Sequence, residues 1–170
     1  RMIFLSGAVH PSIIGLREDL GVMLTPAMGN HPELDATWWG ADTGCFRHPE
    51  DFNWKDYGYF LGKRIRFQGR CLFATAPDYL GDAKTTWERS FPICQLIEAL
   101  GFRPALVAQD GLEDLQIDWS AFGCLFIGGT TKWKISDAAR WLCVQAHRRG
   151  KWVHMGRVNS ERRYNTARLF

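Results

Sequence analysis

Short apolar runs alternate along the chain with longer segments of mixed polarity. Runs in which successive positions are apolar are typical of strands covered on both faces of a parallel sheet, and the longer segments have helical spacing. Strands are expected at Met2–Ala8, Val22–Thr25, Cys71–Ala76, Ala105–Ala108, Cys124–Ile127 and Trp152–Met155. Helices are expected at Pro11–Asp19, Trp54–Gly62, Lys84–Leu100, Ser136–Arg149 and Ser160–Leu169.

This alternation indicates a parallel α/β architecture, either an open doubly wound sheet or a closed barrel. Polar, glycine-rich segments follow nearly every strand, among them ATAPDYLGD, QDG, GGTTKWK and GRVNS. An active face built from many strand ends is the barrel arrangement, whereas a Rossmann sheet would place G-x-G-x-x-G after an early strand. The sequence therefore predicts one domain over residues 1–170, a (β/α)8 TIM-type barrel. We expect it to be incomplete, with about six to seven β/α units and its C-terminal strand or strands missing.

Composition limits the class of protein. Hydrophobic residues make up 46% of the chain, too many for a disordered or fibrous protein. No apolar run approaches the roughly 20 residues of a membrane span, and the first residues lack a signal-peptide pattern, so a cytoplasmic protein is expected. The five cysteines are scattered without a C-x-x-C pair, which favours neither a disulfide framework nor a zinc cluster. We expect no metal and no cofactor.

Charge is distributed unevenly. Residues 1–130 contain 11 Lys/Arg and 16 Asp/Glu, whereas residues 131–170 contain 10 Lys/Arg and 2 Asp/Glu. The simplest interpretation of these basic residues is a solvent-exposed helix face. For the whole basic stretch, a surface that faces a polyanion such as nucleic acid is slightly favoured.

Acids, amides and glycines follow successive predicted strands. In a barrel these positions converge on one pocket. A carboxylate accepts from paired N–H donors, an amide offers a donor and an acceptor, and glycines allow close approach, so the set suits a planar purine. The candidate residues are Asp42, Asp78, Gln109, Asp110, Gly128, Gly129, Met155 and Gly156.

Each candidate also has a structural alternative. Asp42 can form an Asx turn with Gly44, Asp78 can cap the following helix, and Gln109 can begin a simple turn. The Asp-Thr-Gly sequence also occurs in aspartic proteases, but the helical patterns here argue against a mostly β protein.

Five segments, in order, resemble the tRNA-guanine transglycosylase family. ADTGCF is similar to its "DSGGFQ", APDYLGD to "DECTPY", VAQDGLEDL to "VQGGxxxDL", LFIGGTTKW to "VGGLAVGE" and WVHMGRVNSERR to "YLMGVGxPED". The resemblance extends from about Val22 to Arg168. It is closer to the compact bacterial and phage relatives linked to 7-deazapurine modification of DNA, which would place a phage-encoded protein in the host cytoplasm.

The resemblance implies a TIM barrel that exchanges guanine for a 7-deazaguanine in nucleic acid through a covalent intermediate. It implies that Asp42 acts in acid/base chemistry and that Asp78 reads the amino and ring N–H edge of the base. It further implies that Gln109 and Gly129 contact the carbonyl edge, while Met155 and Gly156 form the floor. The Gln109-Asp110 pair replaces Gln-Gly and adds an acid. The basic segment would contact phosphates through Lys132, Lys134, Arg157, Arg162 and Arg163.

The nucleophilic aspartate and the zinc-binding segment of that family would both lie after Phe170, outside this sequence. The expected partners are DNA, slightly favoured over tRNA, and a purine or 7-deazapurine base, with no membrane. A homodimer or a partner protein is compatible with the sequence. Two alternatives stay open: a base-binding partial barrel without catalysis, and a barrel enzyme whose GGTT segment grips a phosphorylated small molecule.

Overall fold

The computed structural model describes residues 2–7, 17–28, 34 and 37–169, and seven parallel strands organise this part of the chain. The strands pair in chain order, each with the next. They are β1 (Phe4–Ser6), β2 (Leu20–Leu24), β3 (Trp38–Ala41), β4 (Cys71–Thr75), β5 (Pro104–Ala108), β6 (Cys124–Ile127) and β7 (Trp152–Met155). The fold is therefore α/β with a parallel sheet, as predicted.

The α-helices begin after residues whose side chains cap the helix N-terminus. Asn53, Asp82, Ser136 and Ser160 each accept a hydrogen bond from a backbone N–H of the first turn that follows. The α-helices are α1 (Trp54–Gly62), α2 (Ala83–Ala99), α3 (Thr131–Lys134), α4 (Asp137–Arg148) and α5 (Glu161–Ala167).

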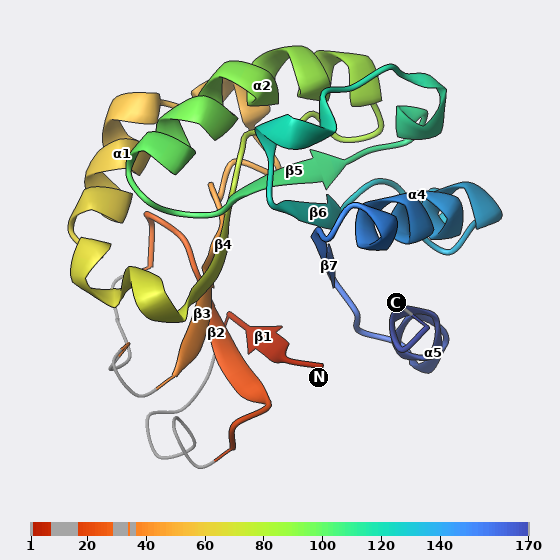
Figure 1. Cartoon of the computed structure of the whole chain (residues 1–170), viewed down its shortest axis with the longest axis horizontal. Helices are drawn as coiled ribbons and strands as arrows, with labels where there is room; N and C mark the ends of the chain where they lie inside the picture. Colours follow the sequence, from red (N-terminus) through yellow and green to blue (C-terminus); the bar gives the residue numbers. More distant parts are fainter. Residues whose placement is uncertain (1, 8–16, 29–33, 35–36, 170) are drawn as a thin grey trace.

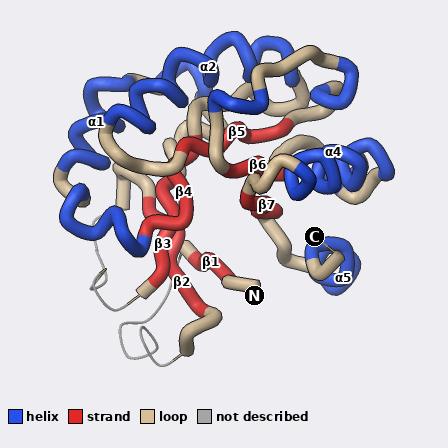
Figure 2. The backbone as a smooth tube through the Cα atoms, in the orientation of Figure 1, coloured by secondary structure: helices blue, strands red, loops and turns tan. Residues whose placement is uncertain are grey.

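The sheet curls into an open half-barrel (Figure 1). Helices α1, α2 and α4 lie on its convex side, and β1 and β7 form its two edges (Figure 2). Helix α5 lies beside this opening, where the Tyr164 ring stacks on Phe4 of β1 with 5.9 Å between ring centroids. The curled parallel sheet is compatible with part of a TIM-type barrel.

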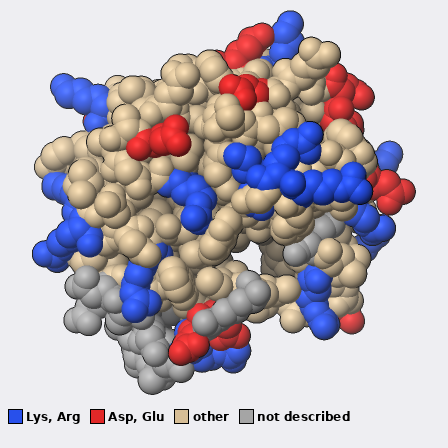
Figure 3. Space-filling view, in the orientation of Figure 1, with Lys and Arg blue, Asp and Glu red and all other residues tan. Residues whose placement is uncertain are grey.

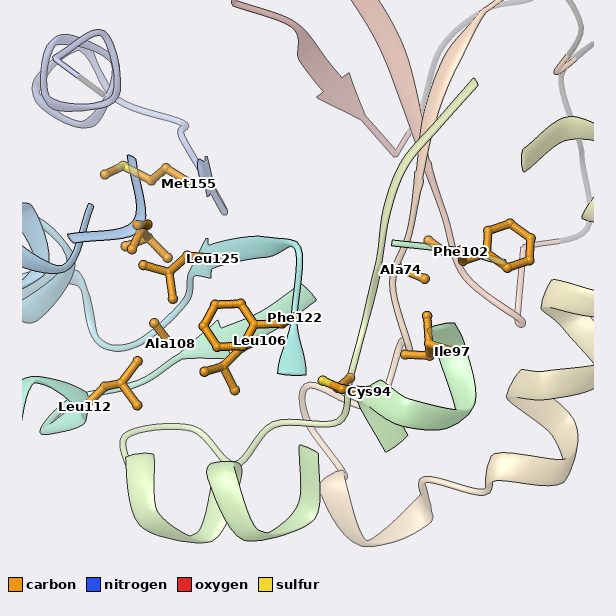
Figure 4. Close-up of a cluster of buried hydrophobic side chains, with 14 of the residues drawn as sticks. Ala74, Cys94, Ile97, Phe102, Leu106, Ala108, Leu112, Phe122, Leu125 and Met155 are labelled. Atoms are coloured by element: carbon orange, nitrogen blue, oxygen red, sulfur yellow. The ribbon is translucent and has the colours of Figure 1, made fainter. Parts of the chain in front are cut away.

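Apolar residues form one layer on each side of the sheet. The larger cluster lies between the strands and the helices. Within it, Ile97 of α2 lies on the side of Ala74 and Phe102, and Cys94 lies nearer Leu106 and Phe122 (Figure 4). The smaller cluster lies on the concave side and includes Phe73 of β4 and Phe126 of β6. Because both faces of the central strands are buried, β5 and β6 are apolar at every position.

One strand was absent from the sequence prediction. No strand was predicted between Val22–Thr25 and Cys71–Ala76, but Trp38–Ala41 forms β3 between β2 and β4. Gly40 lies in close packing there, since a Cβ atom would lie 2.9 Å from Leu5 Cδ1 and 3.1 Å from Phe73 Cζ. A glycine that allows close packing within a strand was therefore not distinguished, in the sequence, from a glycine of a turn.

The other predicted elements differ mainly at their ends. The first strand is shorter, Phe4–Ser6, and the second begins earlier, at Leu20. The helix expected at Pro11–Asp19 falls largely outside the described residues, and its last three residues, 17–19, lie in a turn. The short helix α3 was not expected and lies within the GGTTKWK segment.

Candidate functional site

A cavity of about 900 Å³ lies along the concave face of the sheet, from the start of β6 and β7 to the loops after the strands. This volume lies within the range of small-molecule and cofactor sites. The predicted site residues that line it are Asp42, Asp78, Gln109, Gly128, Lys134, Met155, Gly156 and Arg157. The predicted residues Asp110, Gly129, Lys132, Arg162 and Arg163 are not among the lining residues.

Asp42 follows β3 directly, and its backbone N–H donates to Leu24 O at 2.8 Å. Its Oδ1 accepts the Gly44 N–H at 2.7 Å, so the predicted Asx turn is present. Burial raises the Asp42 pKa, while the bond from Gly44 and the charge of Arg157 act in the opposite direction. Asp42 therefore has both a turn-forming role and a place in the cavity wall.

Asp78 lies three residues after the end of β4 and receives a hydrogen bond from Gln109 Nε2 on its Oδ2, at 2.6 Å. Burial, and to a smaller extent the negative charge of Asp42, together raise its pKa to about 6. Asp78 does not cap the next helix, because Asp82 Oδ1 accepts the Thr85 N–H of α2 instead. The two cavity carboxylates therefore influence each other's ionisation.

Gln109 follows β5 and is 1% exposed. Its Oε1 accepts the backbone N–H groups of Gly81 and Gly129, each at 3.0 Å. Since its Nε2 donates to Asp78, this one amide joins the loops after β4, β5 and β6. The Gly129 N–H, expected at the carbonyl edge of a base, is already donated within the protein.

The loop after β6 is held by Asp110. Its Oδ2 accepts the Thr130 N–H at 2.8 Å and its Oδ1 accepts the Thr130 hydroxyl at 2.7 Å. Gly129 has φ of +65°, and a Cβ there would lie 2.5 Å from the Trp133 ring, so this position requires glycine. Because the Gly129 and Thr130 N–H groups of GGTT already donate to Gln109 and Asp110, the loop is poorly suited to bind a phosphate.

Lys134 lies inside the molecule, unlike the surface cation that the sequence suggested. It is 3% exposed, and its Nζ donates to Gly156 O at 2.8 Å. Burial lowers its pKa to about 8, and the nearby charges of Arg157 and Arg163 act in the same direction. The short helix α3 places Trp133 and Lys134 on its buried side, which the basic character of the segment did not indicate.

Arg157 and Phe46 lie together in the cavity wall. The Arg157 guanidinium lies 3.7 Å from the centroid of the Phe46 ring. Arg157 also has φ of 55°, a left-handed conformation that is uncommon for a residue other than glycine. Sequence reasoning overlooked Phe46, although it ends the same ADTGCF segment that contains Asp42.

Three further predicted cations lie outside the cavity. Lys132 and Arg162 are exposed. Arg163 is partly buried and donates to Arg157 O, Asn159 Oδ1 and Thr131 Oγ1, so it joins α5 to α3. A dense group of basic side chains also lies over α4 (Figure 3).

Apolar and aromatic side chains line the rest of the cavity. Met155 of β7 is 7% exposed. The His154 ring contacts the rings of Phe73 and Phe126, with centroids at 5.0 and 4.8 Å. Burial lowers the His154 pKa to about 4, so the ring is neutral at pH 7. His154 is therefore a packed residue.

The comparisons with known proteins give no relative. No family model, no curated protein and no solved structure matches this chain significantly. In the described part of the chain, no group of three or more His, Cys, Asp or Glu residues is arranged to hold a metal ion. None of the described helices is both long and apolar enough to cross a membrane.

Proposed function

We propose that this protein binds a guanine or 7-deazaguanine base in the cavity and exchanges one for the other in nucleic acid, with DNA favoured over tRNA. One observation carries the proposal. Asp42, Asp78 and Gln109 follow three neighbouring strands and line the same cavity, whose remaining wall is largely apolar. The resemblance of five segments to tRNA-guanine transglycosylases is consistent with this arrangement, and so is a TIM-type barrel.

The polar groups suit the edge of a guanine ring. An ionised Asp78 accepts the exocyclic amino and ring N–H donors that guanine and 7-deazaguanine share. Met155 provides an apolar surface for the ring face. Gln109 occupies one acceptor position of the buried Asp78 carboxylate. A base that lacks these donors would leave its other acceptor positions unpaired, at a cost of about 1–3 kcal/mol.

Base exchange requires that one N-glycosidic bond breaks and another forms at the same sugar carbon. The departing base needs a proton, and the incoming base must lose one. Asp42 is suited to carry this proton because burial raises its pKa toward the working pH. The covalent intermediate requires a carboxylate that attacks the sugar carbon, and the resemblance places that aspartate after Phe170.

The nucleic acid would approach along the basic part of the chain. Arg157 lines the cavity, and Lys132 of α3 and Arg162 of α5 are exposed. A base inside a duplex must first be unstacked and turned out before it can enter the cavity. Phosphate contacts from these cations would hold the strand without reading its sequence.

A second candidate is base binding without catalysis. Within the described residues, Asp42 and Asp78 are the two carboxylates in the cavity wall. If Asp78 reads the base, Asp42 alone would have to serve as both proton carrier and nucleophile. A base-binding partial barrel would need only the recognition groups.

Radiolabelled guanine incubated with full-length protein and either DNA or tRNA distinguishes these functions. We expect label in nucleic acid, more in DNA than in tRNA, and at least a hundredfold less with Asp42→Asn. Gln116→Glu, at an exposed position after β5, is the control and should retain the label. Guanine binding without incorporation into either nucleic acid would refute the exchange reaction and support the second candidate.

A further inference from the structure

The Gln109 side chain is completely buried, yet most of its hydrogen-bonding capacity is used inside the protein. Its Oε1 has two acceptor positions, and the Gly81 and Gly129 N–H groups occupy both. No acceptor position is left on this oxygen for a bound molecule. One Nε2–H is directed to Asp78, so a single N–H remains for any other partner.

These contacts also fix which end of the amide faces which neighbour. If the amide were reversed, its NH₂ group would face two backbone N–H donors, and its oxygen would face the Asp78 carboxylate. Both arrangements would be repulsive. Gly81 and Gly129 therefore determine that Nε2 donates to Asp78 Oδ2.

We infer that Gln109 is a positioning residue, whose amide holds the Asp78 carboxylate in its acceptor orientation and ties the loops after β4 and β6 to each other. The inference rests on the proposed function in that Asp78 is the group that reads the base. Gln109 then acts on a bound base chiefly through Asp78. It stabilises the ionised carboxylate by donating a hydrogen bond to Oδ2, within a wall where burial and Asp42 disfavour that charge.

Two substitutions separate the two halves of this amide. Gln109→Glu keeps the oxygens that accept from Gly81 and Gly129 but replaces the donor with a second carboxylate. Gln109→Met has similar length and removes both halves. Gln116→Glu is the matched control, because it makes the same chemical change at an exposed position.

The first measurement is the Asp78 titration in the free protein, followed by NMR of the carboxyl carbon. The other charged groups that act on Asp78 are Asp42 after β3, Arg157 after β7 and Arg89 of α2. These are unchanged in all variants. We expect the Asp78 midpoint to rise by roughly half a pH unit or more in Gln109→Met, and further in Gln109→Glu, where two carboxylates share one site.

The second measurement is hydrogen exchange at the Gly81 and Gly129 amides. Exchange should be roughly tenfold faster in Gln109→Met than in the wild type, because both N–H groups lose their acceptor. It should stay near the wild-type rate in Gln109→Glu. If Gln109→Met does not fold, the Gln109→Glu titration alone decides the question.

An Asp78 midpoint that is the same in Gln109→Glu as in the wild type would overturn the inference. Neither measurement requires a bound base. Failure of the wild type to bind guanine would refute the proposed function while leaving the positioning result intact, so the two failures are distinguishable.

Discussion

At the scale of single residues, the cavity is built from polar groups that hold one another in place. Gly44 donates to Asp42, Gln109 donates to Asp78, and Lys134 donates to Gly156 O. Such mutual bonding fixes the direction of each carboxylate before a ligand arrives, which lowers the cost of ordering the site on binding. This arrangement also destabilises the ionised carboxylates, because they are buried in the cavity wall and have little contact with water.

The Asp78 carboxylate should therefore lower stability at neutral pH. Its folded pKa is about 6, above the value of 3.8 for an unperturbed side chain, so the folded state retains the proton longer than the unfolded state. The free energy of unfolding then falls as the pH rises between these two values. We expect Asp78→Asn to raise the Tm at pH 7.5 by on the order of 2–5 °C.

Thermal unfolding at pH 4 and at pH 7.5 checks this expectation. The gain should disappear at pH 4, where the wild-type carboxyl is protonated in the folded state. Asp114→Asn, at an exposed position, serves as the control. An equal gain at both pH values would show that ionisation of Asp78 is not its cause.

Gly129 is the residue whose replacement should cost most in the loop after β6. Gly129→Ala introduces a side chain at φ of +65° and a contact of 2.5 Å with the Trp133 ring. We expect a loss of about 2–4 kcal/mol in the free energy of unfolding, measured by urea denaturation. Gly62→Ala is the control, since no atom lies within 4 Å of its added Cβ; a comparable loss there would contradict the steric explanation.

At the scale of elements, the alternation of apolar runs and helical segments predicted most strands and helices but missed β3 and α3. The helix predicted at Trp54–Gly62 is confirmed as α1, and the helix predicted at Ser136–Arg149 is α4, with Ser136 as its N-terminal cap. Strand β3 was missed because Gly40 lies in close packing against Leu5 and Phe73, residues far away in sequence. Local patterns carry no information about such contacts.

The candidate site was predictable where it depends on topology. Parallel strands end at one edge of a sheet, so residues directly after them had to converge, and Asp42, Asp78 and Gln109 do line one cavity. The direction of Lys134 was not predictable, because it depends on the short helix α3. The pairing of Gln109 with Gly81 and Gly129 depends on three separate loops and was equally invisible in the sequence.

Asp82, in the loop between β4 and α2, forms the N-terminal cap of α2. Asp82 accepts the Thr85 N–H at 3.0 Å and the Thr85 hydroxyl at 2.7 Å. We expect Asp82→Ala to lower the free energy of unfolding by about 1 kcal/mol, since the first turn loses its acceptor. Glu88→Ala, an exposed position in the same helix, is the control, and chemical denaturation of both variants should show the larger loss for Asp82.

At the scale of the whole molecule, the basic segment 131–170 contributes to the cavity wall and reaches the open side of the half-barrel. Residues 131–170 carry 10 Lys/Arg and 2 Asp/Glu, and they contribute β7, Lys134 and Arg157 to the cavity wall. The half-barrel is open between β1 and β7, next to α5 (Figure 1). A polyanion attracted to this segment would therefore be brought close to the cavity.

Salt dependence of DNA binding tests this placement. If Lys132 and Arg162 contact phosphates, replacing both by Ala should make the plot of log K against log salt concentration shallower by roughly 1.5–2. Lys55→Ala with Lys84→Ala removes two exposed cations from α1 and α2 and should leave the slope unchanged. Equal changes in the two double variants would indicate a general effect of net charge.

We propose that the cavity between the ends of β3, β4 and β7 receives a purine base. A crystal structure of the protein soaked with guanine would test this binding. We expect ring density between Asp42 and Asp78, with the amino edge on Asp78 and the ring face on Met155. Guanine bound at another place, with this cavity holding none, would contradict it.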